Sequence, residues 1–393
     1  MLSLLYYVLL LSLTLGQFSA LSKSADSNYY LFDLAALLLA FAGTIYFLFG
    51  KRKFSLPKYS ILFLLFSFAA LLSLIVNIPN LPLRELTVSW FYWLRLVVYL
   101  SDALIVYNLV SSGGLSREKL IMPFVFSGVL ISLIGFIQLV VLPDFTTLDP
   151  SLGWDPHKNR LASTFFDPNF TGAYLVICLT LLLHQLFGRR LKAWEIISLV
   201  IISAALFLTF SRSAWLMFAV VIFVYGLFKN KYLFVAALVV AFLAYFAVPR
   251  VQTRISGITD PADSASLRLV SWKDTWQIAK DNLTFGVGYN TFRYVQFKYG
   301  FLDPDTFDVH SGAGSDSSLL FVLATTGVIG LIFYLTALAF PLADAFVRRY
   351  DDWLLIVSLI GGLLIESLFI NSLFYPQIIF LFLVTLFSCS SYR

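Results

Sequence analysis

Apolar runs of about twenty residues recur along the whole chain, and they limit most strongly what it can fold into. A transmembrane helix needs about 20 consecutive apolar residues to cross a hydrocarbon core of ~30 Å, whereas a barrel strand needs only about ten alternating ones. The 393 residues are 60% hydrophobic and 12% charged, well below the roughly 25% charged residues of a soluble domain. The sequence therefore predicts an all-α polytopic bundle of transmembrane helices.

We expect about twelve spans, and each boundary is expected to hold within a few residues. Residues 1–21 could also be a cleaved signal peptide, but a basic segment before the apolar run is missing, so a first transmembrane helix is favoured. The predicted spans are 2–21, 29–49, 60–78, 86–110, 120–142, 170–187, 193–210, 213–228, 232–248, 317–340, 353–373 and 375–390.

Basic residues follow every second predicted span, beginning with Lys51-Arg52-Lys53 after the second. Cytoplasmic loops of membrane proteins carry an excess of lysine and arginine, so this alternation predicts that both termini are cytoplasmic. We interpret the net charge of +5 as a topology signal, and no nucleic-acid partner is expected.

Two long segments are predicted on the opposite side of the membrane, 143–169 and the large loop 249–316. Within the second, Leu269, Trp272 and Trp276 recur at helical spacing. Because tryptophan favours the headgroup region, residues 264–281 are expected to form a helix on or near the membrane surface. No soluble domain is evident, so residues 1–393 are predicted to form a single membrane domain.

Three charged residues fall at membrane depth: Arg95 and Asp102 in the fourth span and Glu366 in the eleventh. A charge in the bilayer costs at least ~2.5–3.5 kcal/mol, so each is expected to face a partner or a cavity. Arg95 and Asp102 share a helix face but lie ~10 Å apart along the axis. A structural pair of Arg95 with Glu366 and a functional cavity are equally compatible with this pattern.

Arg212 lies in a tight turn between the seventh and eighth spans, between Ser211 and Ser213. A structural role would be an arginine whose charge reaches the interface. A functional role would be binding an anion, because the serines can cap the next helix and its N-terminus adds free N–H groups. We favour the functional role, since a tight outer turn is an unusual place for arginine.

Three further segments carry possible chemistry. Arg160 precedes Asn169, which together with Asp167 could instead simply cap the sixth span. Arg268 begins the predicted surface helix and could equally be solvated. Acidic residues and a histidine lie close together before the tenth span, and both residue types serve as general bases. The structural alternatives are that Asp316 caps the next helix and that the histidine is simply solvated. This last group comprises Asp303, Asp305, Asp308, His310 and Asp316.

The two cysteines and three histidines do not show the spacing of a metal site or of a disulfide framework. Cys178 and Cys389 lie singly in apolar runs, and the three histidines are scattered along the chain. No metal ion and no other cofactor is therefore expected.

Taken in order, these segments resemble the O-antigen ligase/polymerase superfamily of Wzy_C-type membrane glycosyltransferases. The resemblance covers about 155–340. Its pieces are Arg160 with Asp167-Pro168-Asn169, then Ser211-Arg212-Ser213-Ala214-Trp215, and then Arg268, Phe285-Gly286-Val287-Gly288, Asp316-Ser317-Ser318 and Thr326-Gly327.

The resemblance implies a bundle of about twelve helices in the bacterial inner membrane, with the active site on the periplasmic side. It implies transfer of a glycan from an undecaprenyl-diphosphate carrier to a glycan, lipid or protein acceptor, without a metal, in polysaccharide biosynthesis for the cell envelope. Arg212 and Arg268, with Arg160 as a weaker third, would bind the diphosphate. Ser211 and Asn169 would support them, and Arg95 would line a groove for the polyprenyl tail.

One departure from the family concerns the base. Family members usually carry a histidine before the tenth span, where this chain has Asp316, and His310 lies six residues earlier. Either residue could orient or deprotonate the acceptor, and both ligase and polymerase activity stay open.

The main alternative function is a transporter or flippase of lipid-linked oligosaccharide, which would be expected to show repeats and broken helices. A peptidoglycan polymerase of the shape and division type is a second alternative.

Overall fold

The computed structural model describes residues 1–23, 28–50, 53–148, 154, 156–187, 192–257, 264–302 and 314–389. Nearly all of the regular structure is helical, and the only sheet in this part of the chain is one short antiparallel pair, β1 (Ala20–Lys23) with β2 (Asn28–Tyr30). The all-α fold class is therefore confirmed.

The first eight helices run from the N-terminus through the centre of the sequence, with boundaries close to the predicted spans. They are α1 (Leu2–Leu15), α2 (Leu31–Phe49), α3 (Ser60–Val76), α4 (Leu83–Ser111), α5 (Arg117–Val141), α6 (Pro168–Leu186), α7 (Ala193–Leu208) and α8 (Arg212–Phe228).

The remaining helices include three that lie within the predicted large loop, namely α10, α11 and α12. The set is α9 (Lys231–Ala247), α10 (Pro249–Ser256), α11 (Ser264–Asp281), α12 (Phe292–Lys298), α13 (Ser318–Arg348), α14 (Trp353–Glu366) and α15 (Pro376–Cys389). The predicted helix 264–281 is thus confirmed, and its position relative to a membrane stays a prediction.

By length and composition, six helices among the described residues could cross a membrane: α1 with the 3₁₀ turn after it, α2, α4, α5, α6 and α13. The pair α9 and α10 would make a seventh, bent by 97° at its break. Five shorter apolar helices, α3, α7, α8, α14 and α15, have 10–17 residues. Each of the twelve predicted spans thus coincides with an apolar helix, and the number that cross the bilayer stays a prediction.

Two predicted spans are shorter in the structure than in the sequence interpretation. The first helix ends at Leu15, because Gly16 adopts a positive φ of 50° and a 3₁₀ turn, Gly16–Ser19, then leads into β1. The eleventh ends at Glu366, and residues 367–375 form turns before α15 begins. These turns form part of the candidate site described below.

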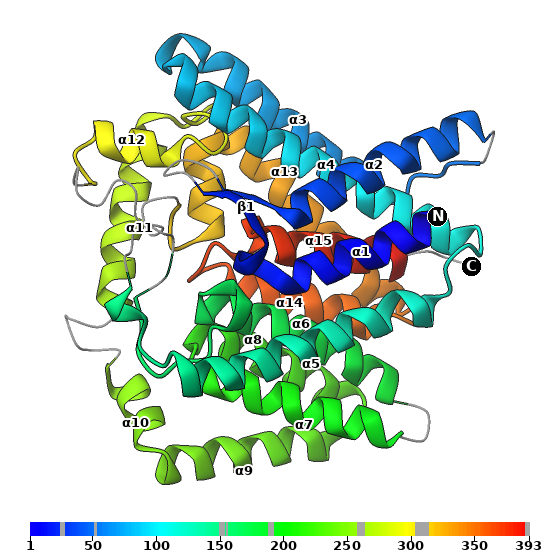
Figure 1. Cartoon of the computed structure of the whole chain (residues 1–393). Coiled ribbons are helices and arrows are strands. Elements are labelled where there is room, and N and C mark those ends of the chain that lie inside the picture. The colour runs from blue at the N-terminus through cyan, green and yellow to red at the C-terminus, as the bar shows by residue number, and fades with distance from the viewer. Residues whose placement is uncertain are drawn as a thin grey trace.

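The helices lie side by side as one bundle (Figure 1). The strongest pairings join α14 with α8, α13 with α3 and α15 with α4. Helices α10, α11 and α12 lie at one end of the bundle, here called the loop end, while α1 begins and α15 ends at the other (Figure 1). Because Ser3 bonds to Gly114 and Arg117 lies 3.7 Å from Cys389, the start of α1 and the end of α15 share that side, and its cytoplasmic location stays a prediction.

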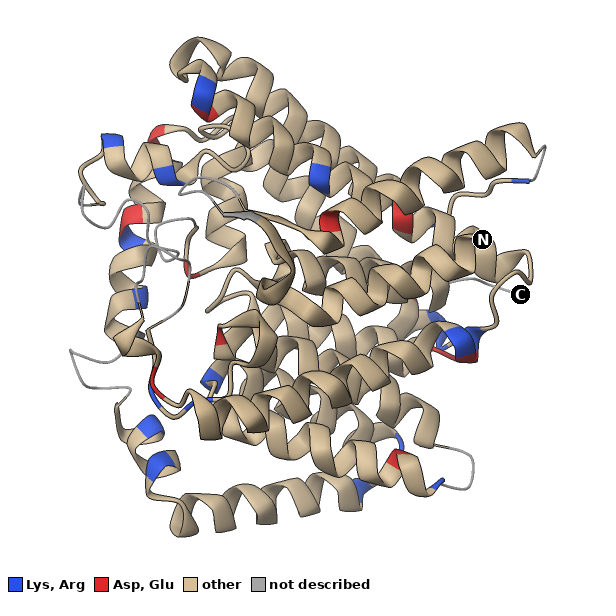
Figure 2. Ribbon diagram, viewed as in Figure 1, with Lys and Arg blue, Asp and Glu red and all other residues tan. Residues whose placement is uncertain are grey.

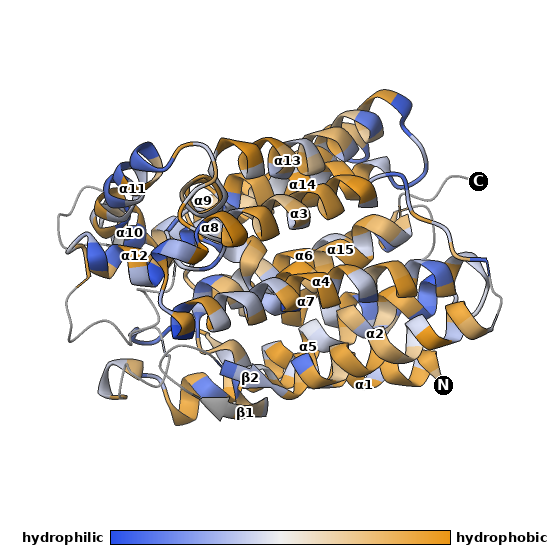
Figure 3. Cartoon of the chain, turned by 90° about the horizontal axis from the view of Figure 1, so that it is seen from above, coloured by the Kyte–Doolittle hydropathy of each residue, from blue (hydrophilic) through white to orange (hydrophobic). Residues whose placement is uncertain are grey.

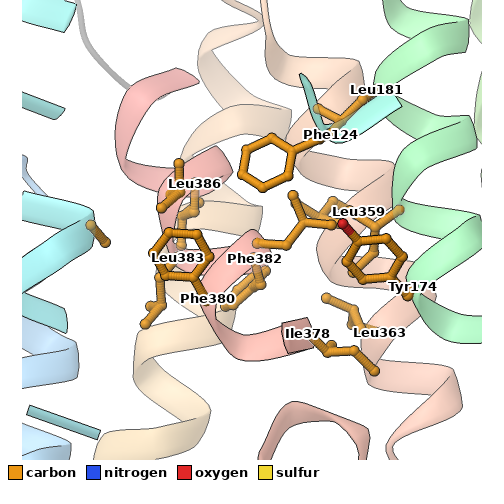
Figure 4. Close-up of a cluster of buried hydrophobic side chains, with 14 of the residues drawn as sticks. Phe124, Tyr174, Leu181, Leu359, Leu363, Ile378, Phe380, Phe382, Leu383 and Leu386 are labelled. Carbon is orange, nitrogen blue, oxygen red and sulfur yellow. The ribbon is translucent and has the colours of Figure 1, made fainter. Parts of the chain in front are cut away.

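The core is centred on α6 and α15, which are buried along almost their whole length. Figure 4 shows Phe380 and Phe382 of α15 among Phe124 of α5, Tyr174 of α6 and Leu359 of α14. By contrast, no residue of α9 is buried, and large apolar side chains cover its surface. Hydrocarbon lipid is the solvent in which such a face is stable.

Helix α13 is broken at Gly327, where φ is 66° and ψ is −171°. The break lies within the predicted tenth span, 317–340, and the apolar pattern of that span does not indicate it. A glycine is required here because an added Cβ would lie 2.2 Å from the carbonyl oxygen of Thr284, and because L-residues disfavour positive φ.

The break leaves carbonyl groups that the segment before α12 satisfies. The N–H of Val287 donates to the carbonyl of Ala324 at 2.9 Å, and that of Gly288 donates to Thr325 at 3.1 Å. In return, the N–H of Val328 donates to Leu283 at 2.7 Å. Two motifs of the family resemblance, Phe285–Gly288 and Thr326-Gly327, therefore dock onto each other and fix the loop end on the bundle.

The charges at membrane depth have partners other than those expected. Arg95 forms an ion pair with Asp33 of α2 at 2.9 Å, so the proposed pair with Glu366 is wrong. Glu366 instead accepts a hydrogen bond from Ser372 at 2.6 Å. Asp102 is fully buried, and neither carboxylate oxygen has a hydrogen-bond partner among the described residues.

Candidate functional site

A cavity of about 880 Å³ opens at the loop end and reaches the middle of α4. Figure 3 shows apolar helices along the bundle and polar residues gathered at α10, α11 and α12, and Figure 2 shows lysine and arginine on these elements and beside them. The charged residues that line the cavity are Arg95, Lys158, Arg160, Asp167, Arg250, Arg254, Arg268, Arg293 and Asp316. Cations outnumber carboxylates among them, so the cavity favours an anion.

Arg160 and Asn169 come together with the α7–α8 turn. The guanidinium of Arg160 donates from Nε to the carbonyl of Thr209 at 2.9 Å and from Nη2 to Oδ1 of Asn169 at 3.0 Å. The hydroxyl of Ser211 donates to the same oxygen at 2.9 Å. Asp167 caps α6, and its Oδ1 accepts a hydrogen bond from the N–H of Asn169 at 2.6 Å. The side-chain oxygen of Asn169 is therefore fixed between Arg160 and Ser211.

The α7–α8 turn also holds α10. Arg212 donates from Nη1 to the carbonyl of Arg254 at 3.0 Å, and Arg254 donates from Nε to the carbonyl of Phe210 at 3.2 Å. The guanidinium of Arg250 lies 4.5 Å from the centre of the Phe210 ring. Ser211 caps α8 by accepting from Ala214, as expected. The turn therefore positions the basic residues of α10 at the cavity.

Helix α11 fixes the position of Asp316. The hydroxyl of Ser271 accepts from the Asp316 N–H at 3.2 Å, and the Trp272 indole donates to the Asp316 carbonyl at 3.1 Å. A third bond joins the hydroxyl of Thr275 to that of Ser315 at 2.9 Å. The helix cap before α13 is Ser317, not Asp316, and Asp316 lines the cavity.

Burial and neighbouring charges shift the pKa values of Arg268 and Asp316, which both line the cavity. Burial lowers the pKa of the Arg268 guanidinium, which the Asp316 carboxylate raises and the charge of Arg212 lowers again. Burial raises the pKa of the Asp316 carboxyl, while Arg268 lowers it and Asp167 raises it. An arginine stays charged in proteins even with a lowered pKa, so the cavity contains a fixed cation together with a carboxyl whose pKa is raised above its ordinary value.

The predicted site residues divide into three groups. Arg95, Arg160, Asn169, Arg268 and Asp316 line the cavity together. Ser211 and Arg212 lie behind its wall, where they bond to Asn169 and Arg254. His310 lies outside the residues that the structure describes.

Several cavity residues were missed by the sequence interpretation. Arg250 and Arg254 lie four residues apart on α10, a helical spacing that could have placed both on one face. Lys158 and His157 come from the 143–169 segment, and no spacing signal distinguished them from solvated residues. The described part of the chain holds no group of three His, Cys, Asp or Glu side chains placed to bind a metal ion.

Replacing Asn169 with alanine is expected to reduce activity about tenfold and stability by about 1–3 kcal/mol, because Arg160 and Ser211 would lose their shared acceptor. Kinetic assays and thermal unfolding in detergent would measure both effects. Asn230→Ala, which removes the cap of α9, serves as control: it should cost about 1 kcal/mol in stability and leave activity unchanged. Equal activity of the two variants would contradict the role of Asn169.

Part of this region matches the model of a known protein family. Residues 197–335, from α7 into α13, match the profile of the family described as O-antigen ligase (Wzy_C). The matched segment includes Arg212, Arg268 and Asp316, and the resemblance to the O-antigen ligase/polymerase superfamily is confirmed. No curated protein matches the chain.

Proposed function

From the place of residues 197–335 in the O-antigen ligase family, we propose that this chain is a membrane enzyme that transfers a glycan from a polyprenyl-diphosphate carrier to an acceptor. One observation carries the proposal. Arg160, Arg268 and Asp316, which come from three distant segments, line the same cavity at the loop end of an apolar bundle. An anion site beside a carboxyl, next to helices that face lipid, suits a lipid-linked diphosphate.

The diphosphate would bind on the cationic side of the cavity. Arg160, Arg254 and Arg268 supply planar guanidinium groups, which match phosphate oxygens better than ammonium groups do. Arg212 would act from behind this wall, by holding α10 through the Arg254 carbonyl and by adding positive charge close to Arg268. The polyprenyl tail would leave the cavity past the α4 side, where Arg95 is neutralised by Asp33.

The reaction needs one nucleophilic substitution. The acceptor hydroxyl oxygen forms a bond to the anomeric carbon, the bond from that carbon to the diphosphate oxygen breaks, and the electron pair leaves with the diphosphate. Asp316 takes the hydroxyl proton, and the arginines stabilise the charge that develops on the leaving group. His310 is the other candidate base of the sequence interpretation and lies outside the described residues.

Transport of the lipid-linked glycan is the competing proposal, and the break in α13 is the feature that could favour it. The carbonyls freed at this break, however, accept hydrogen bonds from Val287 and Gly288. The break thus fastens the loop end to the bundle, which supports a site built for transfer. Transfer would take place on the non-cytoplasmic side of a bacterial inner membrane, with glycan, lipid or protein as acceptor.

Deletion of the gene in its host tests the proposal. A transferase predicts that carrier-linked glycan accumulates on the outer leaflet while mature surface polysaccharide is shortened or lost. Accumulation on the inner leaflet would instead indicate transport and would contradict the proposal.

The pH dependence of transfer tests the role of Asp316. Because burial raises the pKa of this carboxyl, the activity of a base at this position should fall as the pH drops through a value above the ordinary ~3.9 of aspartate. Asp316→Asn should reduce the rate about 100-fold and remove this acid limb from the pH–rate profile. If the acid limb persists in the variant, it belongs to another group and the role of Asp316 as the base is contradicted.

The raised pKa of Asp316 also predicts whether Asp316→Asn stabilises or destabilises the protein. A carboxyl with a raised pKa in the folded state binds its proton more tightly there than in the unfolded chain, so its ionisation reduces stability as the pH rises. Asp316→Asn should therefore raise the unfolding temperature above that pKa, and the gain should vanish in acid. A loss of stability at neutral pH would show that the carboxylate is needed for the fold.

A further inference from the structure

One wall of the cavity is uncharged. Between α14 and α15 and along the start of α15, residues 370–379 contribute only apolar, aromatic and amide side chains to the lining, Asn371, Phe374, Tyr375 and Gln377 among them. Helices α10 and α11 contribute the cations Arg250, Arg254 and Arg268. The cavity therefore offers two different chemistries, and the uncharged wall is poorly suited to a phosphate.

Two amide oxygens in this wall have no hydrogen-bond partner among the described residues, Oδ1 of Asn371 and Oε1 of Gln377. The Gln377 side chain belongs to a residue that is only 2% exposed. A buried acceptor left unpaired costs about 1–3 kcal/mol, and native proteins rarely keep one without a reason. Both residues line the cavity, so a turn of each side-chain amide would present its oxygen to a ligand that donates hydrogen bonds.

Aromatic rings lie beside the two amides. The Tyr375 ring stacks on Phe170, with centroids 4.3 Å apart, and Phe374 stacks on Tyr334 at 5.8 Å. Both Phe374 and Tyr375 reach the cavity. A sugar ring has hydroxyl groups that donate hydrogen bonds and C–H faces that pack on aromatic rings, so this combination of groups matches it.

The wall is held rigidly against the segment that carries Asp316. The N–H of Ser318 donates to the carbonyl of Ser367 at 2.9 Å, and its hydroxyl donates to Ile370 at 3.1 Å. The hydroxyl of Ser372 bonds to Glu366 at 2.6 Å. These bonds fix the backbone on either side of Asn371 before a ligand arrives, which reduces the entropic cost of binding.

We propose that Asn371 and Gln377 form a subsite for an uncharged sugar ring of the glycan substrate. Hydroxyl groups of the sugar donate to the two amide oxygens, and its apolar face packs on Phe374 and Tyr375. The inference rests on the proposed function, because the sugar would be either the one attached to the donor diphosphate or one of the acceptor.

Binding measurements on the purified full-length protein test the subsite with three probes. They are undecaprenyl diphosphate, undecaprenyl diphosphate carrying a single sugar, and the free glycan released by mild acid from the lipid-linked material of the host. Gln377→Met and Asn371→Leu should bind the sugar-free carrier as the wild type does. If the affinity for the single-sugar carrier falls by about 10- to 100-fold, the subsite binds the sugar of the donor. If the affinity for the free glycan falls by the same factor, the subsite binds a sugar of the acceptor.

The unfolding temperature gives a second readout, which distinguishes a role in sugar binding from a purely structural role. Because Gln377→Met removes an unpaired buried oxygen at similar volume, the unfolding temperature should rise while sugar binding falls. Ser358→Ala is the matched control, since its hydroxyl is also buried and without a partner among the described residues but lies outside the cavity. This variant should leave all three affinities unchanged.

The two proposals fail in different ways. If both amide variants bind all three probes with wild-type affinity, the sugar subsite is wrong and the proposed function is untouched. If the wild-type protein does not bind undecaprenyl diphosphate at all, the proposed function itself is wrong.

Discussion

Arg268→Ala is expected to reduce glycan transfer by about 100- to 1,000-fold, the usual loss when one group that stabilises developing charge is removed. Arg268 lines the cavity from α11, and its charge interacts with the carboxyl of the proposed base, Asp316. Loss of the cation would weaken binding of the diphosphate and would also raise the pKa of Asp316 further. The acid limb of the pH–rate profile should therefore move to higher pH in this variant.

Arg268→Lys and Arg348→Ala are the controls for this experiment. Lysine keeps the charge but loses the planar pair of donors, so an intermediate rate is expected. Arg348 lies at the end of α13 remote from the cavity, where it pairs with Asp344 at 2.9 Å, and its removal should leave transfer unchanged. A turnover of Arg268→Ala close to that of Arg348→Ala, at equal protein level, would contradict the proposed mechanism.

Gly327→Ala is expected to destabilise the protein by on the order of 3–5 kcal/mol. The new Cβ would lie 2.2 Å from the Thr284 carbonyl oxygen, and the residue would keep a φ of 66°. As a result, residues 283–288 should separate from the break of α13. Helix α11, which precedes them and fixes Asp316, should lose its support. Thermal unfolding in detergent, together with faster amide hydrogen exchange at Val287 and Gly288, would measure this effect.

Gly300→Ala separates the clash from the backbone strain. Gly300 has a similar φ of 71°, but nothing lies within 4 Å of an added Cβ. This variant should therefore cost only about 1–2 kcal/mol. If the two variants lowered the unfolding temperature equally, the tight docking at Gly327 would not contribute to stability.

Much of the fold could be predicted because its cause is local. Apolar runs set where helices form, and the twelve predicted spans each coincide with a helix. The spacing of Leu269, Trp272 and Trp276 likewise placed α11 at Ser264–Asp281. Helix caps followed the same rule, since Asp167 and Ser211 accept hydrogen bonds from the helices that they precede.

The features that could not be predicted depend on contacts between distant segments. The break at Gly327 follows from the approach of Thr284, more than forty residues earlier, and a glycine in an apolar run does not by itself reveal it. Arg95 has its partner in Asp33, two helices away. The same reason explains the missed cavity residues, because Lys158 and Gln377 reach the cavity only once the segments around them have packed.

The most direct measurement of the central claim follows the fate of the carrier in sealed proteoliposomes. The purified protein would receive lipid-linked glycan isolated from the host and the surface glycan or lipid of that host as acceptor. The account predicts that undecaprenyl diphosphate is released in step with glycan appearing on the acceptor, and that Arg268→Ala loses both. Movement of intact lipid-linked glycan across the bilayer, with no release of undecaprenyl diphosphate, would contradict it.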